Sequence, residues 1–250
     1  MFPYKDENPT FTTPFVTLAL IAANLAVWVF IQGMGTAPAL PDSVCRLGFI
    51  PGYLFGGIPP RTEISLGYGV TCSLGGLPAW LTVLTSMFMH GGWMHLIGNV
   101  WFLWVFGNNI EDSTGHGRFL VFYLLCGVIA ALAQAAADPL SAIPMVGASG
   151  AISGVMGGYL ILYPHVRVFC FVPPFLFFAL PAWTMLLYWL GLQFFGGLAG
   201  LASEEGGGVA FWAHAGGFVA GLVLVKFFAR TEYVEAHRAG NWSPRRLRAG

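Results

Sequence analysis

The chain is short of charge: only 9% of its 250 residues are Asp, Glu, Lys or Arg. Water-soluble domains usually carry about 25% charged residues, so this composition excludes an ordinary soluble domain. With 56% hydrophobic residues and a mean hydropathy of +0.71, the composition instead predicts a polytopic membrane protein. The formal net charge is zero, so the overall charge indicates no particular class of partner.

Cysteine is also scarce, with four residues that form no CxxC pair and are too scattered for a disulfide framework. Cys126 falls within an apolar segment and is expected to be a packed thiol. Cys45 and Cys72 fall in the same long loop, where they have the opportunity to pair if that loop faces an oxidising compartment. The sequence leaves this pairing open.

Apolar segments dominate the sequence, and six of them are predicted to cross the membrane. A further apolar segment, Leu77–Met89, is too short to span and is expected to be an interfacial or re-entrant helix. Pro181 is expected to kink the fifth span. The predicted fold is therefore an all-α bundle of six transmembrane helices. These spans are Phe15–Ile31, Trp93–Phe106, Phe119–Ala137, Ser149–Tyr163, Phe175–Phe195 and Val209–Phe228.

Two long loops rich in glycine separate some of these spans. The apolar content of the first, residues 33–78, favours an ordered loop half-embedded in the membrane interface. The second, Gly196–Gly208, is expected to be flexible. Residues 1–228 are expected to form a single membrane domain, in which the first span is retained rather than cleaved as a signal peptide. Residues 229–250 are expected to form a basic cytoplasmic tail.

Lysine and arginine are unevenly distributed between the two sides of such a chain. Nine lie on the side of both termini, whereas only Arg46 and Arg61 lie on the other side. Because cytoplasmic loops carry an excess of basic residues, both termini are expected in the cytoplasm of a bacterial inner membrane. The basic tail is expected to contact anionic lipid rather than nucleic acid, since it is short and contains Glu232 and Glu235.

Four polar residues fall in the outer part of the predicted spans, at one face of the membrane. His95 and Asn99 share one face of the second span, Ser149 begins the fourth and His214 lies near the start of the sixth. Polar side chains are costly in a bilayer and suggest a functional site. Small residues on the fourth and sixth spans would let these two helices approach closely, bringing His214 towards Ser149. The small residues are Gly150, Gly154, Gly158, Gly217 and Gly221.

Ser149 lies in the segment Gly147–Gly150, where flanking glycines leave its hydroxyl uncrowded at a helix start. The unpaired N–H groups of a first helical turn are suited to hold an oxyanion. We therefore predict a Ser149–His214 dyad, with Asn99 and His95 as oxyanion donors. No Asp or Glu lies in the outer part of any span, so a carboxylate third member is not expected, nor is a cofactor.

Each of these residues also has a structural interpretation. The segment Gly147–Gly150 is compatible with a tight turn between packed helices, and a lone His214 with a hydrogen-bonded packing role. His95 and Asn99 would form only half of a metal site, and because HExxH is absent no metal is expected. His90 is expected to brace the loop rather than to act in chemistry.

Three separated motifs resemble those of the rhomboid intramembrane serine proteases. They are the segment Gly147–Gly150, the segment Ala213–Gly217 that contains His214, and the spacing of His90, His95 and Asn99. The resemblance covers all six spans. It implies a six-helix core, a half-embedded first loop, and cleavage of single-span membrane proteins within or beside their transmembrane segment. It also implies that substrates enter past a mobile fifth helix and fifth loop.

The sequence departs from the pattern of this family at two points. Ser153 stands where some relatives have an aromatic residue that stacks on the base, so His214 is expected to be held differently, by neighbours on the second or sixth span. The first loop also lacks a Trp-Arg pair found in part of the family. A non-proteolytic membrane-protein binder or chaperone is the alternative function, and a transporter is a third.

Overall fold

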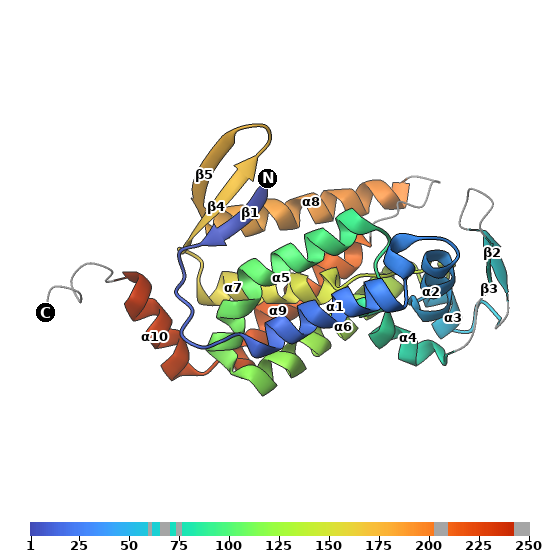
Figure 1. Cartoon of the computed structure of the whole chain (residues 1–250), viewed down its shortest axis with the longest axis horizontal. Coiled ribbons are helices and arrows are strands. Elements are labelled where there is room, and N and C mark those ends of the chain that lie inside the picture. The colour runs from blue at the N-terminus through green and yellow to red at the C-terminus, as the bar shows by residue number, and fades with distance from the viewer. Residues whose placement is uncertain (60–61, 66–70, 74–76, 203–209, 243–250) are drawn as a thin grey trace, which may run out of the picture.

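The computed structural model describes residues 1–59, 62–65, 71–73, 77–202 and 210–242. Its long helices run side by side, with a small sheet and α10 gathered at one end and the first loop at the other (Figure 1). The helices are α1 (Phe15–Phe30), α2 (Ala39–Leu47), α3 (Pro51–Leu54), α4 (Ala79–Thr85), α5 (Trp93–Thr114), α6 (His116–Ala137), α7 (Ser149–Leu162), α8 (Ala182–Ala202), α9 (Phe211–Phe228) and α10 (Thr231–Trp242). Short 3-10 turns are η1 (Gly33–Gly35) and η2 (Ser86–Phe88). The strands are β1 (Phe2–Asp6), β2 (Glu63–Ser65), β3 (Thr71–Ser73), β4 (Arg167–Val172) and β5 (Leu176–Pro181).

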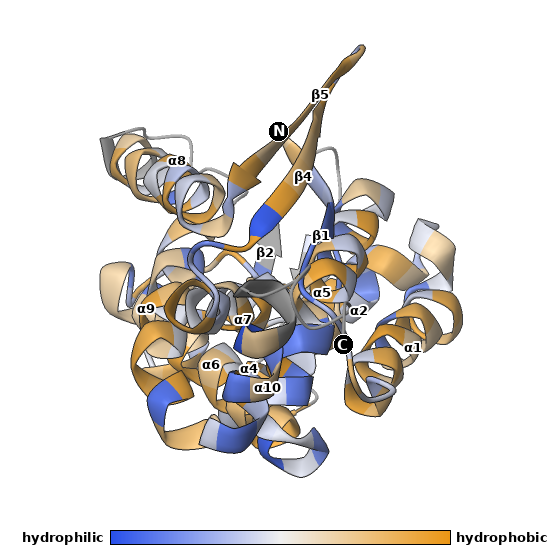
Figure 2. Ribbon diagram, turned by 90° about the vertical axis from the view of Figure 1, so that its left-hand side faces the viewer, coloured by the Kyte–Doolittle hydropathy of each residue, from blue (hydrophilic) through white to orange (hydrophobic). Residues whose placement is uncertain are grey.

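Within the described residues, three helices are both long and apolar enough to cross a membrane, namely α6, α9 and the Ala182–Ala199 part of α8. Helices α1 and α7 are apolar but shorter. Hydrophobic residues predominate on the helices at the periphery of the bundle, as expected for helices that contact lipid (Figure 2). The 14 residues of α7 give it a length of about 21 Å, less than the hydrocarbon core of about 30 Å. The count of six spans stays a prediction.

The expected fifth span, Phe175–Phe195, is wrong at its start. Its first residues form β5, which pairs with β4 in an antiparallel sheet of order β1-β4-β5. The fold is thus mostly helical rather than all-α. A short apolar run rich in phenylalanine suits a strand as well as a helix, and only the pairing partner decides. Pro181 does not kink α8 but ends β5, directly before the helix begins at Ala182.

The predicted loop Gly196–Gly208 is also displaced, because α8 continues through Gly196 to Ala202. Residues 203–209, the rest of that prediction, lie outside the described part of the chain. The first loop contains η1, α2, α3 and a β2–β3 hairpin, and its Phe49 forms a two-way backbone bridge with Met145. Cys45 is disulfide-bonded, whereas the side chain of Cys72 lies outside the described residues.

Two acidic residues at the end of α5 hold the chain that leads into α1. The Glu111 carboxylate accepts hydrogen bonds from the backbone N–H groups of Val16 and Thr17, at 2.8 and 2.7 Å. These donors belong to the first turn of α1 and have no partner within their own helix. The carboxylate of Asp112 accepts from the N–H of Thr12 at 3.0 Å. The polar end of α5 therefore fixes the start of the bundle.

Helix α10 occupies the first part of the predicted tail and packs against the same end of α5. His237 is only 1% exposed, and its Nδ1 lies 3.2 Å from Asn8 Oδ1. Its Nε2 lies 3.4 Å from the carboxylate of Asp112. The described part of residues 229–250 is therefore docked on the membrane domain, and residues 243–250 lie outside the description.

Helices α7 and α9 approach each other so closely that only glycine fits between them. A Cβ on Gly217 would lie 2.1 Å from the carbonyl oxygen of Gly150, and a Cβ on Gly221 would lie 1.9 Å from that of Gly154. Real Cβ atoms never make such contacts, so these glycines set the distance between the two backbones. The first turns of α7 and α9 are held side by side as a result.

Candidate active site

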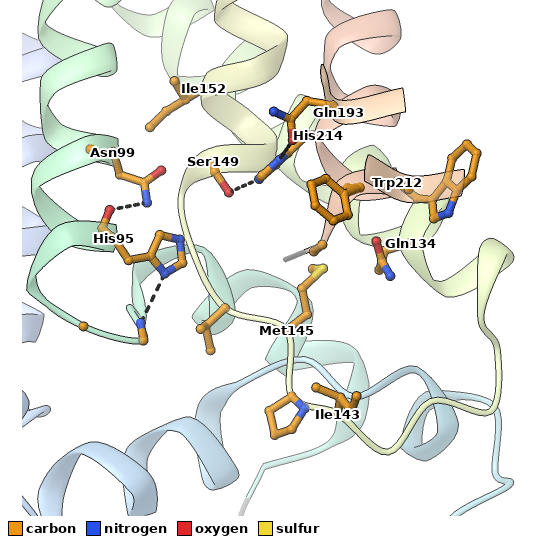
Figure 3. Close-up of a pocket in the computed structure, with 18 of the residues that line it drawn as sticks. His95, Asn99, Gln134, Ile143, Met145, Ser149, Ile152, Gln193, Trp212 and His214 are labelled. Carbon is orange, nitrogen blue, oxygen red and sulfur yellow. Dashed lines mark hydrogen bonds between the residues drawn. The ribbon is translucent and has the colours of Figure 1, made fainter. Parts of the chain in front are cut away.

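Ser149 and His214 face each other across the α7–α9 contact. Ser149 is the first residue of α7 and His214 is the fourth of α9. The Ser149 Oγ lies 2.7 Å from the His214 Nε2, within hydrogen-bond distance (Figure 3). This pair needs no rearrangement to transfer a proton from the hydroxyl to the ring.

The other ring nitrogen of His214 is bound by a residue that the sequence reasoning missed. Gln193, from the middle of α8, places its Oε1 2.7 Å from His214 Nδ1. Because the amide oxygen can only accept, Nδ1 carries the proton and Nε2 presents its lone pair to Ser149. The Trp189 ring, one turn earlier on α8, lies 5.8 Å from the His214 ring. The sequence does carry a signal for Gln193, because a polar glutamine inside an apolar span suggests a functional residue.

The imidazole of His214 is thus held from α8, and not from the second or sixth span as expected. Ser153, which is not aromatic and does not stack on the base, donates its hydroxyl to the Ser149 backbone oxygen at 2.6 Å. Its side chain supports the first turn of α7. The indole of Trp189 supplies an aromatic neighbour for the histidine from a different element.

His95 and Asn99 approach the serine from α5, on the opposite wall of the cavity (Figure 3). The N–H of Gly91 donates to His95 Nδ1 at 3.2 Å, which leaves the proton of the ring on Nε2. Asn99 Nδ2 donates to the backbone oxygen of His95 at 2.8 Å, and its second hydrogen stays available. Both side chains therefore offer hydrogen-bond donors on the Ser149 side of α5.

Gly147 allows the chain to pass between these two walls. Its φ of +125° is rarely adopted by other residues, and a Cβ there would lie 2.6 Å from His95 Nε2. The same Cβ would lie 3.4 Å from Ser149 Oγ. The N–H of Gly147 donates to the backbone oxygen of Ser86 at 2.9 Å, which anchors the turn before α7. His95 Nε2 and Ser149 Oγ therefore flank the same backbone turn.

All four predicted residues line one cavity of about 940 Å³. Its wall combines them with apolar side chains and extends towards the first loop and the loop before α7. Large apolar groups on this wall include Phe102, Ile152, Met156, Trp189 and Phe211. The cavity therefore has a polar centre with apolar surroundings, which suits an extended peptide with hydrophobic side chains.

His90 lies behind this wall and is fully buried. Its backbone N–H and C=O both bond to the Gln32 side chain at 2.8 Å, and its ring lies edge-on to that of His95, 5.3 Å away. Burial lowers the pKa of His90 to about 3, so the ring is neutral. Through these contacts His90 connects the segment before α5 to Gln32 after α1, as expected for a residue that braces the loop. Among the described residues, no group of three His, Cys, Asp or Glu is placed to hold a metal ion.

Residues 78–231, more than half of the chain, match the family model described as the Rhomboid domain. The chain belongs to the rhomboid family. Rhomboid proteins are integral to membranes, so the apolar helices of this chain lie in a bilayer.

Named relatives come from several kinds of organism. The chain is 40% identical over 158 residues to the rhomboid protease GluP of Bacillus subtilis, covering 63% of this chain and 25% of the relative. It is 31% identical over 189 residues to rhomboid-like protease 5 of Toxoplasma gondii, covering 72% and 20%. It is 27% identical over 172 residues to the mitochondrial rhomboid protein 1 of Saccharomyces cerevisiae, covering 65% and 47%. The chain thus spans less than half the length of each of these relatives.

Proposed function

We propose that this chain is an intramembrane serine endopeptidase that cleaves single-span membrane proteins within or beside their transmembrane segment. Ser149 is the nucleophile and His214 the general base. The observation that carries the proposal is the 2.7 Å contact between Ser149 Oγ and His214 Nε2 inside a cavity large enough for a peptide. Membership of the rhomboid family, with relatives named as proteases, supports it.

The proton transfers follow from this geometry. Ser149 Oγ attacks the scissile carbonyl carbon while its proton passes to His214 Nε2. The imidazolium then gives this proton to the leaving amine as the peptide bond breaks, which leaves the acyl group on Ser149. Water hydrolyses this ester with His214 again acting as the base. The hydroxyl and the imidazole are then restored.

Gln193 takes the positioning role that a carboxylate fills in soluble serine proteases. Its amide oxygen accepts from His214 Nδ1 and so fixes both the tautomer and the orientation of the ring. A neutral amide stabilises the imidazolium less than a carboxylate does, but it places no unpaired charge in the bundle while His214 is neutral. The proposed dyad is therefore completed by a neutral third residue.

The oxyanion formed in the attack has three donors available nearby. Ser149 is the first residue of α7, so its backbone N–H has no acceptor within the helix. His95 Nε2–H and the free Asn99 hydrogen approach from α5. In soluble serine proteases, removing one such donor costs about 3–4 kcal/mol of transition-state stabilisation. His95 and Asn99 are accordingly assigned to the oxyanion site.

Water and substrate reach the serine by different routes in this proposal. Because α7 is too short to cross the bilayer, its first residue lies below the surface, and the cavity opens above it towards external water. Substrate helices approach from the lipid beside α8, which is exposed along much of its length. The chain would lie in a bacterial inner membrane with both termini in the cytoplasm, needing neither metal nor cofactor.

The test is cleavage of a single-span reporter protein by the purified chain in lipid vesicles. Ser149→Ala is expected to abolish cleavage and labelling by a serine-directed fluorophosphonate probe, without loss of expression. Ser153→Ala removes a hydroxyl one turn along α7 and is expected to keep both. Undiminished cleavage by Ser149→Ala would end the proposal. Reporter binding without any cleavage or labelling in the wild type would favour the alternative, a non-proteolytic binder or chaperone.

A further inference from the structure

The β4–β5 hairpin exposes an apolar tip that the proposed chemistry does not use. Phe175 is 85% exposed, and the next two residues, Leu176 and Phe177, are 59% and 62% exposed. These three consecutive exposed apolar residues, at the turn and the start of β5, are here termed the hairpin tip. Exposed apolar patches of this kind mark surfaces that contact a partner or a membrane.

The direction of the hairpin places the hairpin tip relative to the bilayer. The hairpin projects sideways from the bundle, across the axes of the long helices, and extends beyond them in both views (Figures 1 and 2). It ends at Pro181, directly before the first residue of α8. The 21 residues of α8 span about 31 Å, close to the thickness of the hydrocarbon core. A segment that leaves the start of α8 sideways therefore stays at the depth of the interface.

The distribution of side chains along the sheet agrees with this depth. Val168 and Cys170 on β4 are fully buried in the main core, so the base of the hairpin is fixed to the bundle. On the other face, aromatic rings contact one another. The ring of Phe171 stacks on that of Phe177 with 4.7 Å between the ring centroids, and the ring of Tyr4 lies edge-on to that of Phe177 at 6.1 Å. The sheet thus carries an aromatic surface outward, as interfacial membrane segments do.

Charge is confined to the base of the same sheet. Arg167 opens β4, places its guanidinium 5.9 Å from the Phe169 ring and pairs with Glu7 at 3.6 Å. Lys5 lies opposite Phe169 on β1. Hydrophilic ribbon at the base of β4 gives way to hydrophobic ribbon towards the turn (Figure 2). Cationic side chains and an exposed apolar tip on one segment are the combination expected of a segment that lies in the membrane interface.

We propose that the hairpin tip inserts into the headgroup–acyl boundary of the leaflet around the start of α8 and anchors this helix to lipid. The lipid leaflet is the partner, because the tip continues the lipid-exposed surface of α8, which includes Trp183 and Leu187. Another protein strand could pair only with the six-residue edge of β5, whose last residue, Pro181, has no backbone donor. The inference depends on α8 lying in the membrane and not on the chemistry of Ser149.

An anchored hairpin would restrict the motion of α8, the helix whose Gln193 and Trp189 contact His214. An anchor at its first residue holds that end at a constant depth, so that displacement of α8 by a substrate occurs as a pivot about the anchored end. The far end, beside the cavity, then moves most. The hairpin would therefore help α8 return to the position in which Gln193 binds His214.

Site-directed spin labelling tests this insertion in the full chain. Phe175→Cys and, separately, Phe177→Cys carry a nitroxide, with the protein in phosphatidylethanolamine–phosphatidylglycerol vesicles. Cys126 and Cys170 are buried, and the unsubstituted protein measures any labelling of native thiols. Leu187→Cys on α8 serves as the lipid reference, and Glu232→Cys on α10 as the water reference.

We expect labels at both tip positions to collide with oxygen several-fold more than with a water-soluble nickel chelate, as at Leu187→Cys. The ratio at Glu232→Cys is expected to be the reverse. A nickel-favoured ratio at Phe175→Cys would overturn the proposal, and so would a label shielded from both reagents, which indicates a protein partner. Because no readout requires cleavage, the result is independent of the proposed protease activity.

Discussion

The Ser149 hydroxyl lies within hydrogen-bond distance of the His214 ring, and a third side chain determines which ring nitrogen accepts its proton. His214 has two nitrogens, and without a fixed acceptor at Nδ1 the neutral ring would distribute its proton between them. Gln193 supplies that acceptor. The chemistry proposed for the serine therefore depends on a residue that acts through the base.

Replacing Gln193 tests this positioning role. Gln193→Leu keeps the approximate size but removes the acceptor, and we expect kcat to fall about five- to tenfold, the loss of one neutral hydrogen bond, with KM nearly unchanged. Cleavage of the vesicle-bound reporter over a range of reporter densities gives the two constants separately.

Gln193→Glu provides the matched control, because it restores an oxygen acceptor at the same distance. We expect it to recover most of the lost kcat and the rate of fluorophosphonate labelling. If Gln193→Leu and Gln193→Glu lower kcat equally, then Gln193 serves packing rather than orientation of His214.

At the scale of elements, the separation of α7 and α9 sets the distance between the reacting groups. Glycines on both helices remove the Cβ atoms that would keep the backbones apart. In a bilayer, hydrophobicity does not drive helices together, so close van der Waals packing of this kind carries much of the association. The same glycines that stabilise the bundle therefore align the candidate active site.

Adding one methyl group at this contact is expected to separate the reacting groups. A Cβ at Gly217 would lie 2.1 Å from the Gly150 oxygen, so in Gly217→Ala helix α9 must move away and carry His214 with it. A displacement near 1 Å costs catalysis about 100-fold, and we expect a loss of kcat of that order. Reporter cleavage measures it, and thermal unfolding measures the accompanying loss of stability.

Gly191→Ala is the control for this substitution. Gly191 lies within α8, and a Cβ there would have nothing within 4 Å. The same chemical change should leave activity and the unfolding midpoint close to those of the wild type. Equal losses in Gly191→Ala and Gly217→Ala would show that the effect comes from helix propensity and not from the α7–α9 distance.

For the molecule as a whole, polar side chains gather at two opposite ends. The candidate active site occupies one end, and the start of α1, the sheet and α10 occupy the other (Figure 1). At this second end, Asp6 of β1 is buried and accepts a hydrogen bond from the Tyr159 hydroxyl of α7. Contacts of this kind tie the N-terminal strand to a helix more than 150 residues away in sequence.

The pH dependence of folding stability tests this contact. Burial raises the pKa of Asp6 from 3.8 to about 7, despite the opposing effect of the Tyr159 hydroxyl. Between these values the folded state holds a proton that the unfolded chain has lost, so stability falls as the pH rises. From pH 5 to pH 8 we expect the loss to be about 2–3 kcal/mol, measured from thermal unfolding in detergent micelles.

Asp6→Asn, which resembles the protonated carboxyl group, is expected to remove most of this dependence. Glu7→Gln alters the neighbouring side chain, which is 44% exposed and whose contact with Arg167 is a surface ion pair. It should leave the dependence intact. An unchanged slope in Asp6→Asn would show that another group is responsible for the pH response.

Several features of this molecule could be predicted because they depend on local pattern. The shortage of charge determined the membrane class, and the periodic small residues indicated which faces of the fourth and sixth spans approach each other. Ser149, His214, His95 and Asn99 were found because polar groups stand out in apolar helices. The structure places these four around one cavity, while their catalytic roles stay proposals.

Other features were decided only by the tertiary structure. The run after Phe175 is apolar enough for a helix, yet pairing with β4 makes it a strand. Gln193 and His214 are 21 positions apart on different helices, and His237 and Asn8 are 229 apart. Such contacts depend on which elements pack against each other in the folded chain, and the local periodicity of the sequence does not contain this information. The amino-acid sequence alone determined the membrane class and the candidate residues; the fold decided what each of them touches.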